Sequence, residues 1–553
     1  MYTFFKTKAK KILSFLALGP FIPKSFELFN KGYDRSHLLD DARAGITVGC
    51  ISLPLAMAFA IGSGVTPERG LYTAIVAGFL ISLLGGSRVQ IGGPTGAYVV
   101  LLYSIVQKHG YEGLALATLI AGLLLAVAGF LRLGSLIRFI PYPVTTGFTA
   151  GIATVLFVSQ IKDFCGFAIA TPSVIFTEKI TQYAQFFYTL NPYALILGLS
   201  TLVLILFLRR YYPKIPASIS AVVVATIAAY LFDLPIKTIE NSYGEIPSSL
   251  PSPQLPYISL QAIQAVLPDA IAIALLGAIE SLLSCVIADS LTGYRHKSNC
   301  ELVGQGFANI ASSLFGGIAA TGAIARTGAN VQLGAKTPLA GIICAATVLV
   351  LMLAFSPFAA KMPLCALGAV LMVVAWNMSE IKHMGAILTG PITDRIILIS
   401  TYVLTVLIDL TFAVQIGVLL AGISFLKKMT EKTVIETEYS QDGVLQLTLK
   451  GPFFFGISEI LNDALVKEPK TPNSVVLSLS HVPFVDATGI QAIKQFQKRC
   501  HSKQISFFVS DVQPEVLQAL SHAKLIHLMR SEKSQVPALG TSEKMIEAQA
   551  EPV

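Results

Sequence analysis

One carboxylate stands out because of the residues around it. Glu280 is the only acidic residue in Ala270–Val286, a run that otherwise holds apolar and small residues and two serines. An ionisable side chain inside an apolar span is costly, which makes it a functional candidate by default. Ser284 and Gly277 share its helix face. Because burial favours the neutral acid, this face suits a proton or a small cation. A buried structural Glu, paired with backbone or with an Arg, is the alternative.

Arg326 is the natural positive counterpart of Glu280. It too lies among small and apolar residues, within Thr321–Gly328. Its charge fits two roles, attraction of a bound anion or an ion pair with Glu280, and the sequence leaves both open.

Two apolar segments are interrupted by Gly, Pro and Thr, at Gly92–Gly96 and at Thr321–Gly328. A half-helix that starts inside a membrane presents free N–H groups and a positive dipole end, which suits an anion. Matching interruptions in two halves of a chain are the typical sign of a binding site near the membrane midplane. Glycines that only permit close helix packing are the alternative.

These elements belong to a chain with the composition of a membrane protein. Of 553 residues, 54% are hydrophobic and 13% are charged, against about 25% charged in soluble proteins. Apolar runs of about 18–22 residues, long enough to cross a bilayer, recur from Asp41 to about Leu426. The net charge of +8 lies in short basic clusters between the runs. This pattern is typical of cytoplasmic flanks and argues against a nucleic-acid partner.

The order of segments predicts a polytopic α-helical membrane protein with a small α/β domain. Residues 1–40 are a basic lead-in at the cytoplasmic face. A transporter region follows at 41–430, with about seven segments in 41–235 and about seven in 260–430. Two sets with an equal, odd number of segments indicate an inverted repeat. An even total places both termini in the cytoplasm, which predicts a bacterial inner-membrane protein.

The last part of the chain has the alternating pattern of a soluble α/β domain, at 434–530. We expect strands at Leu445–Leu449, Val475–Leu479 and Ile505–Val509. Helices are expected after Asp486 and at Pro514–Leu528. The polar tail, 531–553, is expected to be disordered.

Other chemistry is not indicated. The seven cysteines and the histidines show no metal-ligand or triad spacing, and no Walker A motif occurs. We therefore expect no metal, no cofactor and no enzymatic activity. A polar cluster at the end of the Glu280 run is expected to be a solvated loop; its members are Asp289, Arg295, His296, Lys297 and Glu301.

Several long motifs resemble the sulfate permease (SulP) family of anion transporters. They are GGSRVQIGGPTGA, LGAIESLLSCVIADSLTGYRHKSNCELVGQGFANI and GAIARTGANVQLGAKTPLAG. The later VPFVDATGI resembles STAS, a domain shared with anti-sigma-factor antagonists. The motifs IESLL, ELVGQG and LMVVAWNMSE look most like a proton-linked bacterial C4-dicarboxylate transporter.

The resemblance implies a fold of 14 segments in a 7+7 inverted repeat, divided into core and gate domains. It implies an anion between the starts of the third and tenth segments, facing the first. The substrate-binding residues carried over by matching motifs are Leu55, Phe59, Thr95, Ala323, Ile324, Ala325 and Arg326. Family members believed to couple to sodium have Asp and Thr at the positions of Glu280 and Ser284, so the Glu favours protons here.

For the STAS domain the resemblance implies a homodimer and a cytoplasmic regulator as partners. A hydroxyl residue at the position of Thr488 is phosphorylated in sigma-regulatory relatives. For Thr488 itself we favour a helix cap over modification.

The resulting hypothesis is a secondary active anion transporter that works by alternating access. Glu280 and Ser284 form the coupling-ion site, and the cargo is a C4-dicarboxylate such as succinate, or sulfate. The alternatives are a sodium-coupled bicarbonate or sulfate symporter, an uncoupled anion exchanger, and a membrane sensor in which STAS signals.

Overall fold

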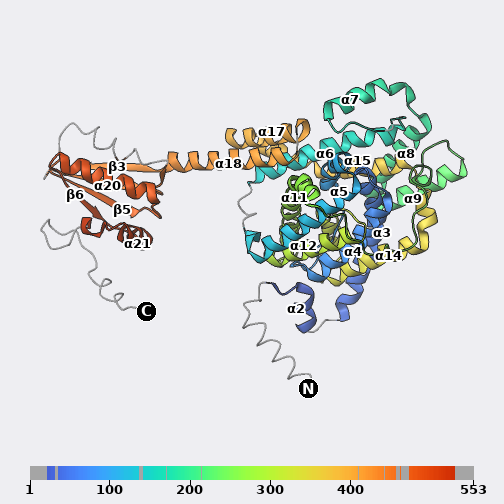
Figure 1. The fold of residues 1–553 in the computed structure, drawn as a ribbon, viewed down its shortest axis with the longest axis horizontal. Helices are drawn as coiled ribbons and strands as arrows, with labels where there is room; N and C mark the ends of the chain where they lie inside the picture. Colours follow the sequence, from blue (N-terminus) through green and yellow to red (C-terminus); the bar gives the residue numbers. More distant parts are fainter. Residues whose placement is uncertain are drawn as a thin grey trace, which may run out of the picture. The chain divides into compact units, whose positions relative to one another are not determined.

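The computed structural model describes residues 21–31, 35–135, 141–169, 171–212, 215–408, 410–440, 443–455, 461 and 472–529 (Figure 1). The chain forms two compact units, Met1–Leu419 and Leu420–Val553, which are treated separately below. The predicted tail at 531–553 and residues 1–20 of the lead-in lie outside the described residues.

The first unit is helical because its apolar sequence leaves the backbone polar groups no partners except one another. In the described residues, eight helices are long and apolar enough to cross a membrane. The helices before residue 250 are α2 (Lys24–Lys31), α3 (Arg35–Gly62), α4 (Pro67–Leu84), α5 (Gly96–Phe130), α6 (Tyr142–Cys165), α7 (Phe176–Gln185), α8 (Pro192–Tyr211), α9 (Ala217–Leu231) and α10 (Ile239–Tyr243).

The second half of the chain repeats this order. Its helices are α11 (Leu260–Thr292), α12 (Ser298–Leu314), α13 (Ile324–Gln332), α14 (Leu339–Ala360), α15 (Leu364–Met378), α16 (Ile381–Leu388), α17 (Ile392–Leu407) and α18 (Leu410–Lys432). Gly110 breaks α5 into two helices, because its φ of 67° is not helical. When α5 is counted as two helices and the helices of ten residues or fewer are left aside, except α13, which follows β2, the described residues hold seven helices in each half.

The helices of the first unit pack in two groups. In one, which we call the core, α3, α4 and α5 pack against α11, α12, α13 and α14. In the other, the gate, α6, α8 and α9 pack against one another and against α15 and α17. Helices α3 and α5 also contact α6, α9 and α15, so the boundary between core and gate runs along them.

The two halves of the chain meet at a short two-stranded sheet inside the core. Strand β1 (Gly92–Gly93) pairs antiparallel with β2 (Thr321–Gly322). Helix α5 begins at Gly96, shortly after β1, and α13 begins at Ile324, shortly after β2. The two interrupted segments are therefore brought together, and each leads directly into a helix.

The second unit holds a four-stranded sheet in the order β3-β4-β5-β6. The strands are β3 (Val434–Tyr439), β4 (Val444–Lys450), β5 (Ser474–His481) and β6 (Ser506–Ser510), with helices α20 (Ala487–Ser502) and α21 (Pro514–His522). The three predicted strands are confirmed. Sequence analysis missed β3, because most of this edge strand is exposed and it has no apolar alternation to reveal it.

Asp486, not Thr488, caps helix α20. The Asp486 side chain accepts a hydrogen bond from the backbone N–H of Gly489, at 2.7 Å. Thr488 is exposed and lies within the first turn. The expectation that Thr488 caps this helix is therefore wrong, because the residue before the helix supplies a stronger acceptor.

The polar cluster after the Glu280 run is not a solvated loop throughout. Glu301 is fully buried and accepts hydrogen bonds from the Gly86 backbone N–H at 2.8 Å and from the Gln305 amide at 2.9 Å. His296 and Asp289 pair at 2.7 Å. The solvation expected of Glu301 is wrong, since this carboxylate holds the loop that follows α4.

Candidate functional site

The start of α5 offers polar groups that the protein itself does not use. Thr95 is the residue before the helix, its backbone is extended, and its side chain makes no capping hydrogen bond. The Thr95 hydroxyl is buried and has no hydrogen-bond partner among the described residues. Since the first N–H groups of a helix also lack internal partners, this end of α5 is ready to receive an acceptor.

Arg326 lies beside the start of α5, although it belongs to the first turn of α13. Its Nη2 donates a hydrogen bond to the carbonyl oxygen of Pro94. Gly93 permits this approach, because a Cβ there would lie 3.0 Å from the guanidinium Nη1. Arg326 is only 5% exposed, so its positive charge is concentrated where the two interrupted segments meet.

Glu280 is buried on α11 between the starts of the two half-helices. One turn before it, Gly277 lies so close to the Tyr98 hydroxyl of α5 that a Cβ would be 2.3 Å from it. One turn after it, Ser284 donates a hydrogen bond to Thr327 of α13, at 3.1 Å. The shared face predicted for Gly277, Glu280 and Ser284 is thus the face that α11 turns toward α5 and α13.

Glu280 and Arg326 do not pair with each other. Within the described residues, Glu280 is 5% exposed and its carboxyl group forms neither an ion pair nor a hydrogen bond. Arg326 uses Pro94 instead. Of the two roles considered for Arg326, the ion pair with Glu280 is therefore wrong in this conformation.

A hydrogen-bond network that the sequence did not reveal fixes β1 and β2 against α11. Ser281 bonds to the Thr321 hydroxyl at 2.7 Å and accepts from the Gly322 N–H at 3.2 Å. The Gln90 amide donates to the Ser281 carbonyl at 2.9 Å. Ser281 and Gln90 have no unusual spacing in the sequence, so only their contacts identify them as residues that position the site.

Apolar residues of α3 and of the gate helices surround the start of α5. Around Gly96, a Cβ would lie 3.0 Å from the Met378 sulfur of α15 and 3.3 Å from both Leu156 of α6 and Phe59 of α3. Leu55, one turn before Phe59, is also buried in the same apolar cluster. The structure therefore places Phe59 at the start of α5, and it adds Leu156 and Met378, which no sequence signal distinguishes from other apolar residues.

The remaining predicted residues lie at the start of α13. Ala323 precedes the helix and is buried, Ile324 is partly buried, and Ala325 is exposed. No group of three or more His, Cys, Asp or Glu side chains suited to a metal ion occurs among the described residues.

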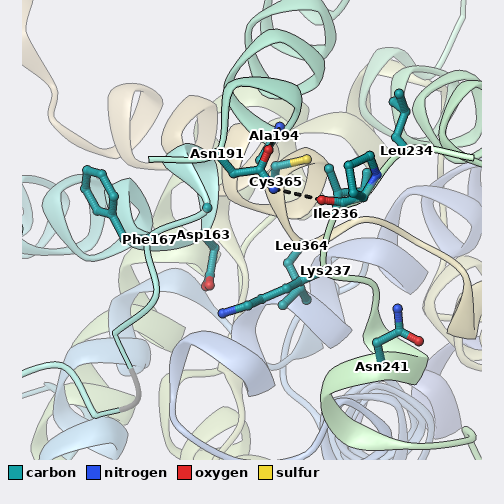
Figure 2. Close-up of a pocket in the computed structure, with 12 residues that line it drawn as sticks. Asp163, Phe167, Asn191, Ala194, Leu234, Ile236, Lys237, Asn241, Leu364 and Cys365 are labelled. Carbon is teal, nitrogen blue, oxygen red and sulfur yellow. Dashed lines mark hydrogen bonds between the residues drawn. The ribbon is translucent and has the colours of Figure 1, made fainter. Parts of the chain in front are cut away.

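A cavity of about 380 Å³ lies elsewhere, at the ends of α6, α8 and α15 (Figure 2). In Figure 2 the Lys237 ammonium points toward the Asp163 carboxylate across this cavity. None of the predicted site residues lines it. The chemistry of the candidate site thus rests on the two half-helix starts rather than on this cavity.

The arrangement brings a buried cation, a buried unpartnered hydroxyl and two helix N-termini to one place. Groups of these kinds are suited to binding an anion. The nearby carboxyl group of Glu280 can exchange a proton. No nucleophile–base pair accompanies these groups in the described residues.

The sequence matches two known family models. The Sulfate permease family model matches residues 38–401, and the STAS domain model matches residues 437–536. This chain belongs to the sulfate permease family. The STAS domain of this family member is the second unit described above, and the protein is a membrane transport protein rather than an enzyme.

Two curated relatives and one solved structure illustrate the similarity. Putative sulfate transporter YvdB of Bacillus subtilis is 40% identical, over 90% of this chain and 96% of the relative. Bicarbonate transporter BicA of Picosynechococcus is 30% identical, over 92% of this chain and 94% of the relative. The overall structure of SLC26A9 matches with a TM-score of 0.84 at 18% identity, covering 95% of this chain and 92% of that one, which supports the fold alone.

These matches correct the finer resemblance. The relatives are named for sulfate and bicarbonate, whereas the sequence motifs pointed to a C4-dicarboxylate transporter. The family and its STAS domain are confirmed, and the closeness to a C4-dicarboxylate transporter is not.

Proposed function

We propose that this protein carries a small oxyanion, sulfate or bicarbonate, across the bacterial plasma membrane by alternating access, coupled to proton uptake at Glu280. The names of the relatives above support this class of substrate. A succinate-like dicarboxylate remains a substrate to be tested beside them.

One observation carries the anion site. The unpartnered Thr95 hydroxyl and the buried Arg326 guanidinium both lie at the start of α5, where β1 meets β2. A buried polar group without a partner destabilises a protein. A bound ligand with acceptor atoms would offset this cost, because both the hydroxyl and the guanidinium could donate to it. An oxyanion offers several acceptor oxygens.

The coupling site is proposed to be Glu280, with Ser284 beside it. The Glu280 carboxyl group is buried and forms neither an ion pair nor a hydrogen bond within the described residues, so no fixed partner prevents it from taking up and releasing a proton. Because the Ser284 hydroxyl donates to Thr327, it links the state of α11 to α13 and thus to the anion site. Sodium coupling at the same two residues is the alternative.

Alternating access is proposed to move the core against the gate. The contact between the start of α5 and gate residues Leu156 and Met378 lies on the boundary between the two groups. When the core moves, this contact changes, which opens the anion site to one side and then to the other. Both termini are proposed to be cytoplasmic, with STAS mediating dimer contacts and, through Thr488 or another exposed residue, regulator binding.

Purified protein in proteoliposomes tests the proposal. Uptake of radiolabelled sulfate, bicarbonate and succinate is measured with and without an imposed pH gradient, and with and without sodium. We expect saturable uptake of sulfate or bicarbonate that increases when the outside is acidic. Uptake that needs sodium, or that occurs only in exchange for internal anion, would support the alternative mechanisms. No uptake of any of these anions would contradict the function itself.

A further inference from the structure

Helix α7 carries a lysine on its buried face. Lys179 is 4% exposed, and α7 lies in the segment between the long helices α6 and α8. Within the described residues, its ammonium group forms neither an ion pair nor a hydrogen bond; it lies 5.5 Å from the centre of the Tyr103 ring. A cation–π contact offsets only part of the cost of burying a charge. Lys179 therefore lacks the counter-charge that a buried cation normally has.

Lys179 keeps its charge near neutral pH. Burial lowers the pKa of its ammonium to about 8, so the protonated form still predominates at pH 7. Within the described residues the neighbouring carboxylate of Glu178 forms no ion pair with Lys179, and it accepts a hydrogen bond from the Ser173 hydroxyl at 2.7 Å. The charge is thus available to a negative group from outside the protein.

Tyr103 joins this lysine to the boundary between core and gate. Its ring lies against Gly64, just after α3, where a Cβ would be 3.0 Å from the ring. Its hydroxyl donates a hydrogen bond to the carbonyl of Pro172, in the loop before α7, at 2.6 Å. This hydrogen bond therefore ties Tyr103, a core residue, to the loop before α7, a helix that packs against the gate helices α6 and α17.

Tyr103 also lies on the helix face that leads from the anion site. It follows Gly96 by seven residues, which returns it to the same face about 10 Å farther along α5. At Gly96 this face meets Phe59, Leu156 and Met378. The Tyr103 ring that Lys179 faces and the start of α5 thus lie along one face of α5, on the boundary between core and gate.

We propose that Lys179 and Tyr103 form a second, transient site for small oxyanions, which the substrate occupies before it reaches Thr95 and Arg326 from the α7 side. The inference rests on the proposed function of the Thr95 site. When the gate opens on this side, the bond between Tyr103 and Pro172 breaks. The Tyr103 hydroxyl then donates to an anion that the Lys179 ammonium attracts.

The test compares transport from the two sides of the membrane. Right-side-out and inside-out vesicles bearing the full chain are given radiolabelled sulfate, or bicarbonate if the wild type does not carry sulfate. For Lys179→Met we expect the half-saturating concentration to rise about tenfold on the α7 side and less than twofold on the other. Lys179→Arg, which keeps the charge, should stay within about threefold of wild type.

Lys361→Met is the matched control. Lys361 also lies over a tyrosine ring, that of Tyr230 at 4.8 Å, but it is exposed. Lys361 lies between α14 and α15. Leu364, the first residue of α15, donates a backbone hydrogen bond to Lys237, so Lys361 lies near the same end of the helices as α7. This variant should leave the half-saturating concentration unchanged on both sides.

A pH series on the wild type keeps the inference testable even where Lys179→Met fails to fold. Between pH 7 and pH 9 the lysine loses most of its charge, so half-saturation on the α7 side should rise severalfold more in wild type than in Lys179→Arg. The other titratable groups on α7, on the α6, α17 and η3 segments packed against it, and at the ring that faces Lys179 are Tyr103, Tyr142, Lys162, Asp163, Cys165, Glu178, Tyr183, Tyr188, Asp394, Arg395 and Tyr402. These groups are unchanged in Lys179→Arg, and so is Glu280, whose proposed proton coupling makes transport depend on pH in both proteins. A rise in half-saturation that is as large in Lys179→Arg as in wild type overturns the inference.

The outcomes separate this inference from the proposed function. A wild type that carries no anion would overturn both. Transport by the wild type with no sided change in Lys179→Met, with equal changes on both sides, or with a loss that Lys179→Arg does not restore, would overturn the role of Lys179 alone.

Discussion

Arg326 of the second repeat donates a hydrogen bond to the carbonyl of Pro94 of the first. The bond places a guanidinium group one residue before Thr95, whose hydroxyl has no partner among the described residues. The second half of the chain therefore supplies the guanidinium beside the start of α5, and neither half alone contains all groups of the proposed anion site.

Arg326→Lys should weaken anion transport although it keeps the charge. A lysine ammonium is a point charge and cannot donate to Pro94 and to an anion in the planar geometry of a guanidinium. We expect uptake at low substrate concentration to fall at least tenfold, with a smaller change in maximal rate. Sulfate and bicarbonate uptake in proteoliposomes measures this, and wild-type behaviour of Arg326→Lys would contradict the role of the guanidinium.

Thr95→Val should weaken anion binding without lowering the stability of the protein. Removing a hydroxyl that bonds to nothing in the protein leaves the free energy of unfolding unchanged or slightly increased. The anion loses one donor, worth about 1 kcal/mol or roughly a fivefold loss of affinity. Thermal unfolding with and without sulfate or bicarbonate measures both quantities. Thr95→Ser is the control that keeps the hydroxyl, and a large loss of stability in Thr95→Val would show that the hydroxyl has a structural partner.

Glu280→Gln should remove the response to a pH gradient and leave the fold intact. The amide imitates the protonated acid, and no ion pair of Glu280 is lost. Uptake driven by the anion gradient alone should persist, while its stimulation by an acidic outside should disappear. Asp269→Asn, on the same helix but paired with His109 at 3.3 Å, is the control that should keep the stimulation. Equal stimulation in wild type and Glu280→Gln would exclude Glu280 as the proton carrier.

Gly96→Ala should slow transport, and Met378→Ala should restore it. The added methyl group would lie 3.0 Å from the Met378 sulfur, tighter than an ordinary contact. It therefore disfavours the state in which core and gate meet at this point. We expect the maximal rate of Gly96→Ala to fall a fewfold and that of the double variant to return toward wild type. Additive losses would show that the two residues do not meet during transport.

Asp486→Ala should loosen the start of α20 in the STAS domain. It removes the cap on the Gly489 N–H and a second bond from the Phe455 N–H at 3.2 Å. The cost of losing an N-terminal cap is about 1 kcal/mol. Hydrogen exchange of the first-turn amides of the full chain should speed up several-fold, whereas Thr488→Ala should leave it unchanged. If Thr488→Ala speeds up this exchange as much as Asp486→Ala does, Thr488 also caps the helix and the prediction is wrong.

The sequence determined the kind of protein this is. Apolar runs of membrane length and two interrupted segments indicated a helical membrane protein with a central site, because these features depend on local composition and spacing. Gly92–Gly96 and Thr321–Gly328 were recognised as a pair for the same reason. The family and the STAS domain were predicted from the resemblance of long motifs.

Only the tertiary structure decided which residues meet. Arg326 bonds to Pro94 rather than to Glu280, and Ser281, Gln90, Leu156 and Met378 join the site from elements far apart in the chain. Glu301 is buried although it follows a polar stretch, because the loop after α4 brings unpaired backbone N–H groups to it. Such contacts depend on how the helices pack, and they cannot be predicted from the type of a side chain or from its neighbours in the sequence.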